Sequence, residues 1–299
     1  MSTRLDGRVA VVTGAGRGIG RAAAEALAAL GAAVVVNDPG VSDRGEGEDR
    51  AFADEVVQGI RASGGTAVAS YDSVAEWESA GRIFETAERE LGAVDILVNN
   101  AGLAAGAPVD RLDPELFATV VGVHLFGTFH CTRHAVEGMR ERGWGRVVNI
   151  VSRAGLLGSP GTSAYAAGKA GIYGFTNSAS RDLGRYGITV NNVNPAATHT
   201  RMIDDAVERA RARGLDSSSA ERMLAVAQEP ERVAAVIAFL CTEAAEGING
   251  QTFFVQGNAV GLFAPLEVTQ TLERDEPWTP ETLAEAAREF RLHPLDALY

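Results

Sequence analysis

The stretch Val9-Ala10-Val11-Val12-Thr13-Gly14-Ala15-Gly16-Arg17-Gly18-Ile19-Gly20 decides the fold of this chain of 299 residues. Its first five residues are apolar or β-branched, which is typical of a buried strand, and glycine then occupies every second position from 14 to 20. Glycines permit a tight turn that lies close to a ligand, and a helix that begins there offers free N–H groups to an anion. The order strand, turn, helix therefore predicts a pyrophosphate-binding turn. We expect five residues to contact a dinucleotide here: Gly14, Arg17, Gly18, Ile19 and Gly20.

The rest of the chain repeats the alternation of a short apolar run with a longer helical pattern. The expected strands span Val9–Thr13, Ala33–Asn37, Thr66–Ser70, Asp95–Asn99, Arg146–Val151, Thr189–Val193 and Thr252–Val255. The expected helices lie near Gly18–Leu30, Arg50–Ala62, Glu76–Leu91, Pro114–Arg142, Ser163–Tyr186 and Pro230–Thr242. Apolar strands that alternate with helices form parallel sheets covered on both faces. The sequence therefore predicts an α/β fold, a single doubly wound Rossmann domain with a parallel seven-stranded sheet and helices on both faces.

Two segments lie outside this alternation. Residues 201–229 are a polar, helical insertion between the last two expected strands. Residues 262–299 follow the final strand, and their Pro-Trp-Thr-Pro-Glu-Thr-Leu run predicts a capped short helix. We expect a dinucleotide-binding and catalytic domain over residues 1–261, and a C-terminal extension that packs on this core or on a partner subunit.

Composition argues against several classes of function. The net charge of −12 speaks against a general nucleic-acid-binding protein, because phosphate contacts need clustered Lys and Arg. Cys131 and Cys241 are expected to be buried, reduced thiols, and the spacing of cysteines and histidines indicates no metal site. The N-terminal residues lack an apolar signal core, and no run approaches the roughly 20 apolar residues of a membrane span. We therefore expect a cytoplasmic protein that acts without a membrane.

The residue after the second expected strand selects the cofactor. A carboxylate at Asp38 can accept hydrogen bonds from both hydroxyls of an adenosine ribose and would repel a 2′-phosphate, which favours NAD. Arg17 favours NADP, because a basic side chain beside the glycine turn can form an ion pair with a 2′-phosphate. Asp38 is expected to lie closer to the 2′ oxygen, so we expect NAD and keep NADP as the alternative.

One lysine stands among 26 arginines, and its neighbours point to proton transfer. Lys169 follows Tyr165 by four residues, so the two side chains share one face of a helix. There an ammonium can lower the pKa of the phenol from about 10 toward neutrality, which would make Tyr165 a proton donor and acceptor. Ser152 directly follows the fifth expected strand, at the edge where open parallel sheets bind ligands. Its hydroxyl can stabilise negative charge that builds on a carbonyl oxygen during hydride transfer.

The glycine spacing, the run Asn99-Asn100-Ala101-Gly102 and the Tyr-x-x-x-Lys helix thirteen residues after a serine resemble the short-chain dehydrogenase/reductase family over about residues 5–260. The resemblance implies that Ser152, Tyr165 and Lys169 are catalytic, that Lys169 also holds the nicotinamide ribose, and that residues 201–229 are a mobile lid. It implies these further cofactor contacts: Asp72 and Ser73 at the adenine, Asn100, Ala101 and Gly102 at the ribose, and Pro195, Thr198 and Thr200 at the nicotinamide carboxamide. A strand-end turn carboxylate is the alternative interpretation of Asp72. Ala196 stands where the family usually has glycine.

His124 stands where the family usually has a fourth catalytic residue, an asparagine that bends its helix and holds a water behind the lysine. A neutral imidazole can also donate and accept a hydrogen bond, so we keep His124 as a catalytic candidate. The alternative is a core histidine whose ring nitrogens are satisfied by the backbone.

Three runs carry a resemblance to one subgroup of the family: Val34-Val35-Val36-Asn37-Asp38-Pro39-Gly40 with the longer loop after it, Tyr71-Asp72-Ser73-Val74 and Val123-His124-Leu125. In these runs the chain looks most similar to the (3R)-hydroxyacyl-CoA dehydrogenase module of peroxisomal multifunctional enzyme type 2. The resemblance implies an NAD-linked oxidoreductase that acts on a secondary alcohol or ketone, with a 3-hydroxyacyl-CoA as one candidate substrate. Five arginines of the expected lid could receive CoA phosphates, or could belong to an ordinary solvated helix. The resemblance also implies assembly as a homodimer or homotetramer. Two alternatives stay open: an NADP-linked carbonyl reductase of secondary metabolism, and a module that senses NAD(H) without turnover.

Overall fold

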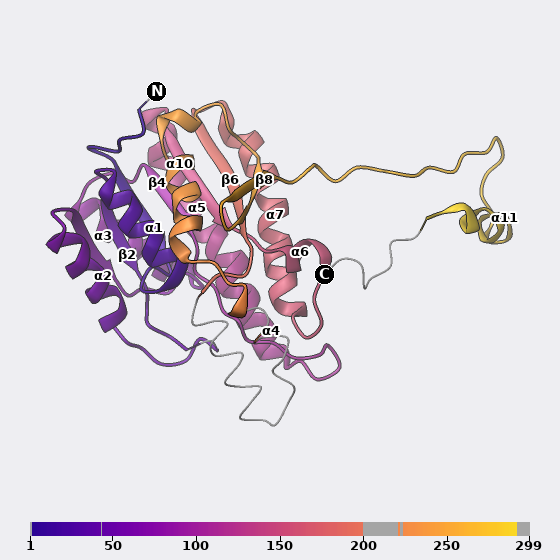
Figure 1. Cartoon of the computed structure of the whole chain (residues 1–299), viewed down its shortest axis with the longest axis horizontal. Helices are drawn as coiled ribbons and strands as arrows, with labels where there is room; N and C mark the ends of the chain where they lie inside the picture. The colour runs from indigo at the N-terminus through magenta and orange to yellow at the C-terminus, as the bar shows by residue number, and fades with distance from the viewer. Residues whose placement is uncertain (1, 43, 200–220, 222–223, 292–299) are drawn as a thin grey trace. The chain divides into compact units, whose positions relative to one another are not determined.

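The fold is built on one sheet, which Figure 1 shows among its helices. The computed structural model of the chain describes residues 2–42, 44–199, 221 and 224–291. It divides into two units, residues 1–262 and 263–299. The first unit holds the sheet, the helices that cover it and every described residue of the expected site.

Eight strands form the sheet, in the order β3-β2-β1-β4-β5-β6-β7-β8. Their bounds are β1 Val9–Thr13, β2 Ala33–Asn37, β3 Thr66–Ser70, β4 Ile96–Asn99, β5 Gly145–Ile150, β6 Ile188–Pro195, β7 Thr252–Gln256 and β8 Ala259–Leu262. The first seven strands pair in parallel, as predicted. The predicted number of strands was one too low, because β8 pairs antiparallel with β7. All four residues of β8 are exposed, so no buried apolar run marks it in the sequence. A two-residue Gly257-Asn258 turn joins it to β7 and was the one available signal.

In the described part of the first unit, the helices are α1 Gly18–Ala29, α2 Ala51–Ala62, α3 Trp77–Glu90, α4 Pro114–Val121, α5 Gly127–Arg142, α6 Arg153–Leu157, α7 Ser163–Gly184 and α10 Pro230–Leu240, with the short 3-10 helix η2 at Glu243–Ala245. A π-helical turn, η1, spans Gly122–Phe126 between α4 and α5. The single helix expected over Pro114–Arg142 is therefore interrupted, directly at His124. Such π turns are frequent at functional sites.

Two apolar layers cover the sheet, one on each face. Side chains of α1, α2 and α10, such as Leu27, Val56 and Ile237, pack with one set of strand residues. Side chains of α3, α5 and α7, such as Ile83 and Met139, pack with the other. The strands β1, β2 and β5 are buried on both faces, which explains their continuous apolar runs.

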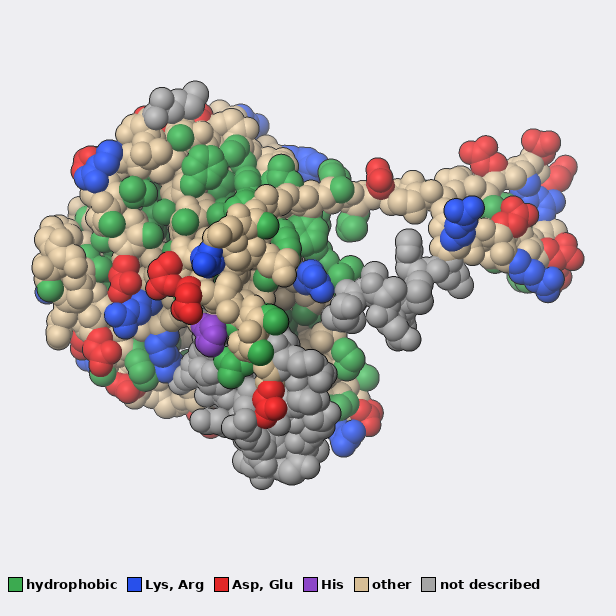
Figure 2. Space-filling model, in the orientation of Figure 1, with side chains coloured by type: hydrophobic (Ala, Val, Ile, Leu, Met, Phe, Trp, Pro, Cys, Tyr) green, Lys and Arg blue, Asp and Glu red, His purple; other side chains and the backbone are tan. Residues whose placement is uncertain are grey.

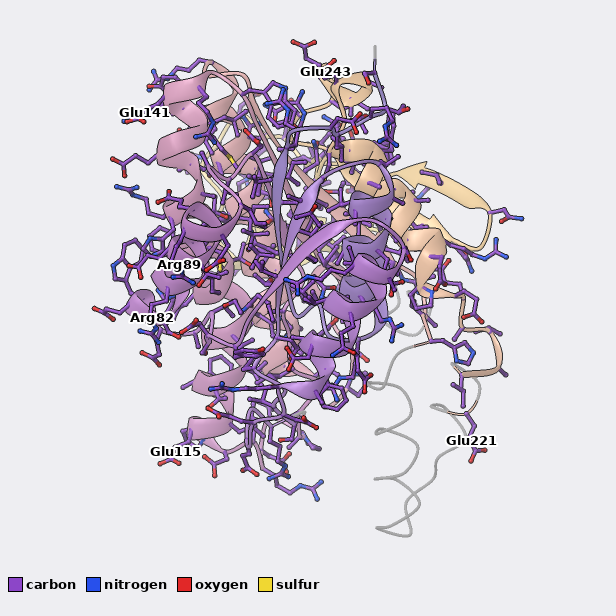
Figure 3. The ribbon with its side chains drawn as sticks, turned by 90° about the vertical axis from the view of Figure 1, so that its left-hand side faces the viewer. Arg82, Arg89, Glu115, Glu141, Glu221 and Glu243 are labelled. Atoms are coloured by element: carbon purple, nitrogen blue, oxygen red, sulfur yellow. The ribbon has the colours of Figure 1, made fainter. Side chains whose placement is uncertain are left out.

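The carboxyl ends of the strands lie together at one edge, and the strand order there defines a crevice. β1 lies between β2 and β4. Successive strands are therefore added on one side of β1 up to β3 and on its other side from β4 onward. Ligands of open α/β sheets bind outside the carboxyl ends of the strands at such a point. In Figure 3, Glu115 of α4 and Glu243 of η2 mark opposite ends of the unit, and Glu243 lies at the amino edge.

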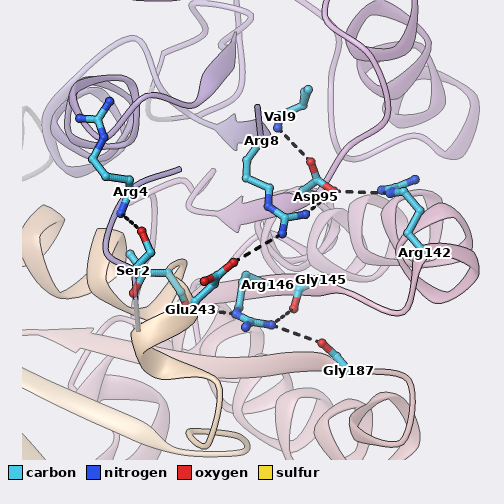
Figure 4. Close-up of polar contacts among 11 residues, drawn as sticks. Ser2, Arg4, Arg8, Val9, Asp95, Arg142, Gly145, Arg146, Gly187 and Glu243 are labelled. Carbon is cyan, nitrogen blue, oxygen red and sulfur yellow. Dashed lines mark hydrogen bonds and ion pairs between the residues drawn. The ribbon is translucent and has the colours of Figure 1, made fainter. Parts of the chain in front are cut away.

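The amino edge is held by ion pairs, which Figure 4 draws. The buried carboxylate of Asp95 accepts from the backbone N–H of Val9 at 3.2 Å. It pairs with Arg8 at 3.5 Å and with Arg142 at 3.4 Å. These contacts tie β1 and β4 to the end of α5, which fixes the two strands on either side of the crevice.

A buried arginine fastens the neighbouring strands at the same edge (Figure 4). Arg146 is 1% exposed and donates to the carbonyl oxygens of Gly145 at 2.9 Å and of Gly187 and Thr242 at 3.3 Å. Its guanidinium lies 4.4 Å from the ring centre of Trp144. Burial lowers the pKa of Arg146 from its ordinary value. Among the described residues no carboxylate lies within ion-pair distance of it, so backbone carbonyls carry most of its solvation.

The second unit contains the short helix α11, Pro280–Ala286, and the 3-10 helix η3, Ala287–Glu289. Thr279 caps α11, and its side chain and that of Thr282 bond each other's backbone N–H in a capping box. The predicted cap and short helix are both present. Leu266 and Val268 of the preceding segment are 86% and 83% exposed.

Charged side chains of both signs lie on the face that Figure 2 shows. On the face in Figure 2, acidic and basic side chains are interspersed over the described residues. No helix in the described part of the chain is long and apolar enough to cross a membrane. Within those same ranges, no group of three or more His, Cys, Asp and Glu side chains could hold a metal ion.

Candidate active site

The glycine turn after β1 lies too close to its neighbours to accommodate side chains. Gly14 has a φ of +62°, and a Cβ there would lie 2.8 Å from the Cα of Ala101. A Cβ on Gly20 would lie 2.2 Å from the carbonyl oxygen of Gly14. The side-chain amide of Asn100 donates to the carbonyl oxygens of Thr13 and Gly14 at 3.0 and 2.9 Å. The turn and the Asn-Asn-Ala-Gly run after β4 are thus one packed unit.

Thr13 completes this unit and was not among the predicted site residues. Its hydroxyl accepts from the backbone N–H groups of Asn100 and Ala101, both at 3.1 Å. The signal was available in the sequence, because Thr13 is the one hydroxyl residue in a strand of valine and alanine and directly precedes the first glycine.

Asp38 lies beside the turn, at the end of β2, and is 8% exposed. One carboxylate oxygen accepts from the backbone N–H of Gly16 at 2.9 Å, and the other accepts from Gly40 at 2.8 Å. The carboxylate is therefore fixed in place between the glycine turn and the loop after β2. Arg17 stacks on the ring of Phe52 at 3.7 Å and donates to the carbonyl oxygen of Val41 at 3.4 Å.

Asp72 and Ser73 follow β3 and belong to a surface network. Asp72 pairs with Arg82 of α3 at 2.7 Å, and Figure 3 shows Arg82 on the outer side of the molecule. The backbone N–H of Ser73 donates to the hydroxyl of Ser79 at 2.9 Å. Both residues lie at the carboxyl edge with the turn, and the ion pair already uses one oxygen of Asp72.

Ser152, Tyr165 and Lys169 meet at the end of β5. Ser152 caps α6, with its hydroxyl accepting from the backbone N–H of Ala154 at 3.2 Å. The Ser152 side chain also lies close enough to Tyr165 to lower the pKa of its phenol. Lys169, 4% exposed, lies one turn after Tyr165 on α7 and has its ammonium 5.8 Å from the tyrosine ring centre. That ammonium donates to the carbonyl oxygen of Ile150 at 2.6 Å.

The pKa of Tyr165 differs in direction from the sequence-based expectation. Burial raises the pKa of Tyr165 above its ordinary value, and the nearby side chain of Ser152 opposes this only in part. Burial also lowers the pKa of Lys169 from 10.5 to about 7, so at neutral pH the ammonium is only partly charged. The sequence argument considered the charge of the lysine without the desolvation of both groups, and desolvation is the larger effect here.

His124 is buried beside this centre at 1% exposure. Its Nε2 lies 3.0 Å from the backbone nitrogen of Leu103 and 2.9 Å from the carbonyl oxygen of the same residue. Its ring meets that of Tyr165 edge-on, with centroids 5.2 Å apart. Burial lowers the pKa of His124 to about 3, with the nearby Lys169 acting in the same direction, so the imidazole is neutral.

The packing around His124 depends on two glycines. A Cβ on Gly102 would lie 2.4 Å from the Cε1 atom of His124, and a Cβ on Gly168 would lie 2.9 Å from the Cβ atom of His124. The Nδ1 atom is buried and has no hydrogen-bond partner among the described residues. The ring therefore fills a tight space between the Asn-Asn-Ala-Gly run and α7, and its backbone contacts run through Nε2 alone.

The loop after β6 carries the residues expected at the nicotinamide. Pro195 ends β6, and the hydroxyl of Thr198 donates to the carbonyl oxygen of Ala196 at 2.8 Å. Gln228 was not predicted, yet its amide donates to the Thr198 hydroxyl at 3.3 Å and to the carbonyl oxygen of Val255 at 3.0 Å. Gln228 thereby fastens this loop to β7, and no pattern in the sequence marks it. Thr200 lies outside the described residues, as do residues 201–220, 222 and 223 of the expected lid.

A dinucleotide fits this edge on three observations. The glycine turn exposes backbone where a Cβ would collide, as a pyrophosphate requires. The Asp38 carboxylate is already oriented at the end of β2. Directly before Pro195, the fully buried side-chain amide of Asn194 has both polar atoms without a partner among the described residues. A buried orphan of this kind is expected where a bound molecule or water completes a site.

Comparison with known proteins gives the same assignment. A sequence model of the family described as short chain dehydrogenase matches residues 8–211. The hydroxyacyl-CoA dehydrogenase ChsB1 of Mycobacterium tuberculosis is 37% identical over 301 residues, which cover 97% of this chain and 90% of that protein. The peroxisomal multifunctional enzyme type 2 of Mus musculus is also 37% identical, over 289 residues that cover 94% of this chain and 36% of that longer protein.

Solved structures agree in fold. A crystal structure of a short chain dehydrogenase from Mycobacterium avium has a TM-score of 0.79 and 36% identity, and covers 95% of this chain and 94% of its own. A gluconate 5-dehydrogenase from Burkholderia cenocepacia, solved with NADP and tartrate, has a TM-score of 0.73 and 32% identity, and covers 85% of this chain and 96% of its own. The chain belongs to the short-chain dehydrogenase/reductase family and is an oxidoreductase that transfers a hydride to or from a secondary alcohol or ketone.

Proposed function

We propose that this enzyme uses NAD(H) and acts on a 3-hydroxyacyl or 3-oxoacyl thioester, with Ser152, Tyr165 and Lys169 as its catalytic residues. The observation that carries the assignment of residues is that the Ser152 side chain, at the carboxyl end of β5, lies close enough to Tyr165 to lower the pKa of its phenol. The buried Lys169 lies one helical turn away from that pair. Hydrogen-bond donors that already point toward one position stabilise an oxyanion that develops there.

In the proposed mechanism the residues of the chain handle the oxygen and its proton. The Ser152 hydroxyl donates to the carbonyl oxygen of the substrate and holds it beside Tyr165. As negative charge builds on that oxygen, the Tyr165 hydroxyl gives it a proton, and in the oxidative direction Tyr165 takes that proton back. The bound nicotinamide supplies or accepts the hydride. Lys169 lies within reach to compensate charge on the phenolate, at a pKa near neutrality that lets it exchange protons.

The role of His124 follows from its surroundings. Because the imidazole is neutral and its Nε2 is engaged with Leu103, we assign it to supporting the reaction centre and not to donating protons directly to substrate. The sequence suggested a proton relay through a water behind Lys169. The Nδ1 atom of His124 has no partner among the described residues and can hydrogen-bond a water there, so this relay stays a prediction.

A substrate screen tests the proposal. Purified enzyme is assayed at 340 nm with NADH or NADPH against acetoacetyl-CoA, longer 3-oxoacyl-CoA thioesters and a panel of simple ketones. We expect turnover of the thioesters with NADH, and a loss of about three orders of magnitude or more in Tyr165→Phe, which keeps the ring and removes the proton. Turnover in Tyr165→Phe close to that of the wild type would refute the catalytic assignment.

The preference for NAD rests on Asp38. Its carboxylate is fixed by Gly16 and Gly40 at the end of β2, where a 2′-phosphate would meet a negative charge. Arg17 is stacked on Phe52, which holds its guanidinium by the loop after β2. We expect Asp38→Ala to lower the ratio of NADH affinity to NADPH affinity by about tenfold or more. Fluorescence titration with each cofactor measures the two affinities. An unchanged ratio of the two affinities would favour the NADP-linked alternative.

The thioester class rests on the relatives. ChsB1 is named a hydroxyacyl-CoA dehydrogenase and matches nearly the full length of this chain. The arginines at 201, 209, 211, 213 and 222 that could receive CoA phosphates lie outside the described residues. A comparison of acetoacetyl-CoA with its N-acetylcysteamine thioester tests whether the CoA portion contributes to KM.

We infer a homodimer or homotetramer from an exposed surface on η1, α5 and α7. Phe126 and Phe129 are 54% and 45% exposed, and Phe129 contacts Phe175 of α7 edge-on. Neighbouring positions on α7 carry small residues: Ala167, Ala170, Gly174 and Ser178. Aromatic side chains next to a small-residue surface suit close helix packing against a second copy. Comparing the sedimentation of Phe129→Ser with that of the wild type tests this oligomeric state.

Two further expectations stay predictions: that the C-terminal extension packs on the core or on a partner subunit, and that the protein is cytoplasmic.

A further inference from the structure

A row of buried polar side chains crosses the sheet from β4 to β7, on the face covered by α5 and α7. The amide of Asn99 donates to Asn149 at 2.8 Å, and the amide of Asn149 donates to the hydroxyl of Thr176 at 2.8 Å. That hydroxyl donates to the side-chain oxygen of Asn192 at 2.7 Å, and the amide of Asn192 donates to the hydroxyl of Thr252 at 3.1 Å. All five side chains are at most 5% exposed.

Thr176 is the central link of this row. It accepts one hydrogen bond and donates the next, so every bond in the row points the same way across the sheet. Bonds aligned in this manner strengthen one another, and in a buried environment each unmade bond is expensive. Removing the hydroxyl would leave the amide of Asn149 and the oxygen of Asn192 without these partners at once.

The three residues joined at this link come from the elements that carry the reaction centre. Thr176 lies on α7, seven residues or about two turns after Lys169, and so on the same face of the helix. Asn149 lies on β5, three residues before Ser152. Asn192 lies on β6, three residues before Pro195. The ammonium of Lys169 also bonds the carbonyl oxygen of Ile150, the residue next to Asn149.

We propose that Thr176 is a positioning residue, whose hydroxyl sets the distance of α7 from β5 and β6 and thereby holds Tyr165 and Lys169 in register with Ser152. The inference rests on the proposed function, because it assigns those three residues to the reaction. Geometry matters at this level: a displacement of about 1 Å at a reacting group can slow a reaction by roughly a hundredfold.

The test compares three variants. Thr176→Val removes the hydroxyl and keeps the shape, whereas Thr176→Ser keeps the hydroxyl. Thr252→Val is the matched control: it removes a buried hydroxyl from the last link of the same row, on a strand that carries none of the proposed catalytic residues. We expect both valine variants to lower Tm. A difference in rate between Thr176→Val and Thr252→Val therefore cannot be explained by stability alone.

The first readout is steady-state kinetics with NADH and acetoacetyl-CoA. We expect kcat to fall about tenfold or more in Thr176→Val, with KM for NADH within about twofold, and to be restored in Thr176→Ser and unaffected in Thr252→Val. The second readout needs no substrate. Because Lys169 is the one lysine of the chain, lysine labelled with ¹³C at Cε gives a single resonance whose pH titration reports its pKa.

We expect that pKa to rise in Thr176→Val, because water enters a loosened contact between α7 and β5, and to stay unchanged in Thr252→Val. Unchanged kcat and an unchanged titration in Thr176→Val would overturn the proposal. Tyr165→Phe separates the two ideas: if it retains activity, the proposed function fails, while the lysine titration still decides whether Thr176 sets the position of α7.

Discussion

Replacing Lys169 by methionine should make the protein more stable at low pH while it removes the activity. Burial lowers the pKa of the Lys169 ammonium from 10.5 to about 7. Between these two values the unfolded chain binds a proton that the folded chain does not, so the stability of the wild type falls as pH falls from about 10 to about 7 and then levels off. The methionine side chain of the Lys169→Met variant does not titrate, and its apolar character suits a site that is 4% exposed.

The size of the effect follows from the two pKa values. At pH 6 the desolvated ammonium destabilises the wild type by roughly 5 kcal/mol relative to high pH, and at pH 9 by roughly 2 kcal/mol. Loss of the hydrogen bond to Ile150 costs the variant about 1 kcal/mol at either pH. The stability of Lys169→Met minus that of the wild type should therefore be larger at pH 6 than at pH 9 by about 2 to 3 kcal/mol.

Urea denaturation at pH 6 and pH 9 measures this difference, at one protein concentration and without cofactor. Other titrating groups cancel because they are common to both proteins. Lys169→Arg is the control, since its charge persists at both pH values. A difference between Lys169→Met and the wild type that stays constant from pH 6 to pH 9 would refute the argument that the ammonium is desolvated.

Three further substitutions test the structure away from the lysine. Gly14→Ala should fold but lose NADH affinity by about a hundredfold, because its Cβ would lie 2.8 Å from Ala101 at a φ of +62°; fluorescence titration that finds wild-type affinity would contradict the packed turn. Arg146→Met should lower the free energy of unfolding by about 2 to 4 kcal/mol in urea denaturation and leave KM unchanged, because three carbonyl oxygens lose a donor; a stabilised variant would show that the buried charge outweighs them. Gly102→Ala should lower kcat in the steady-state assay, because its Cβ would lie 2.4 Å from the ring of His124; unchanged kinetics would show that this ring can move freely.

The parts of the fold that were predictable are those that depend on local sequence. The glycine turn, the seven parallel strands and the order of Ser152, Tyr165 and Lys169 all follow from spacing over a few residues. β8 escaped prediction because an exposed strand has no apolar pattern to mark it. The π turn at His124 also escaped prediction, since the helical pattern over Pro114–Arg142 is continuous in the sequence.

The electrostatics of the site depend on contacts between distant segments, which a sequence does not give in advance. The i,i+4 spacing correctly placed Lys169 and Tyr165 on one helix face. It could not reveal that both groups are desolvated, or that the ammonium bonds a carbonyl of β5. Gln228 and Thr176 were missed for the same reason, because their partners lie between 16 and 30 residues away in the chain.

A crystal structure with NADH and a substrate-like ketone tests the central claim most directly. The account predicts the ketone oxygen within about 3 Å of the hydroxyls of both Ser152 and Tyr165, with its carbon facing the reactive carbon of the nicotinamide ring. A ketone bound with its oxygen away from Tyr165, or a nicotinamide ring outside the crevice at the end of β5, would contradict it.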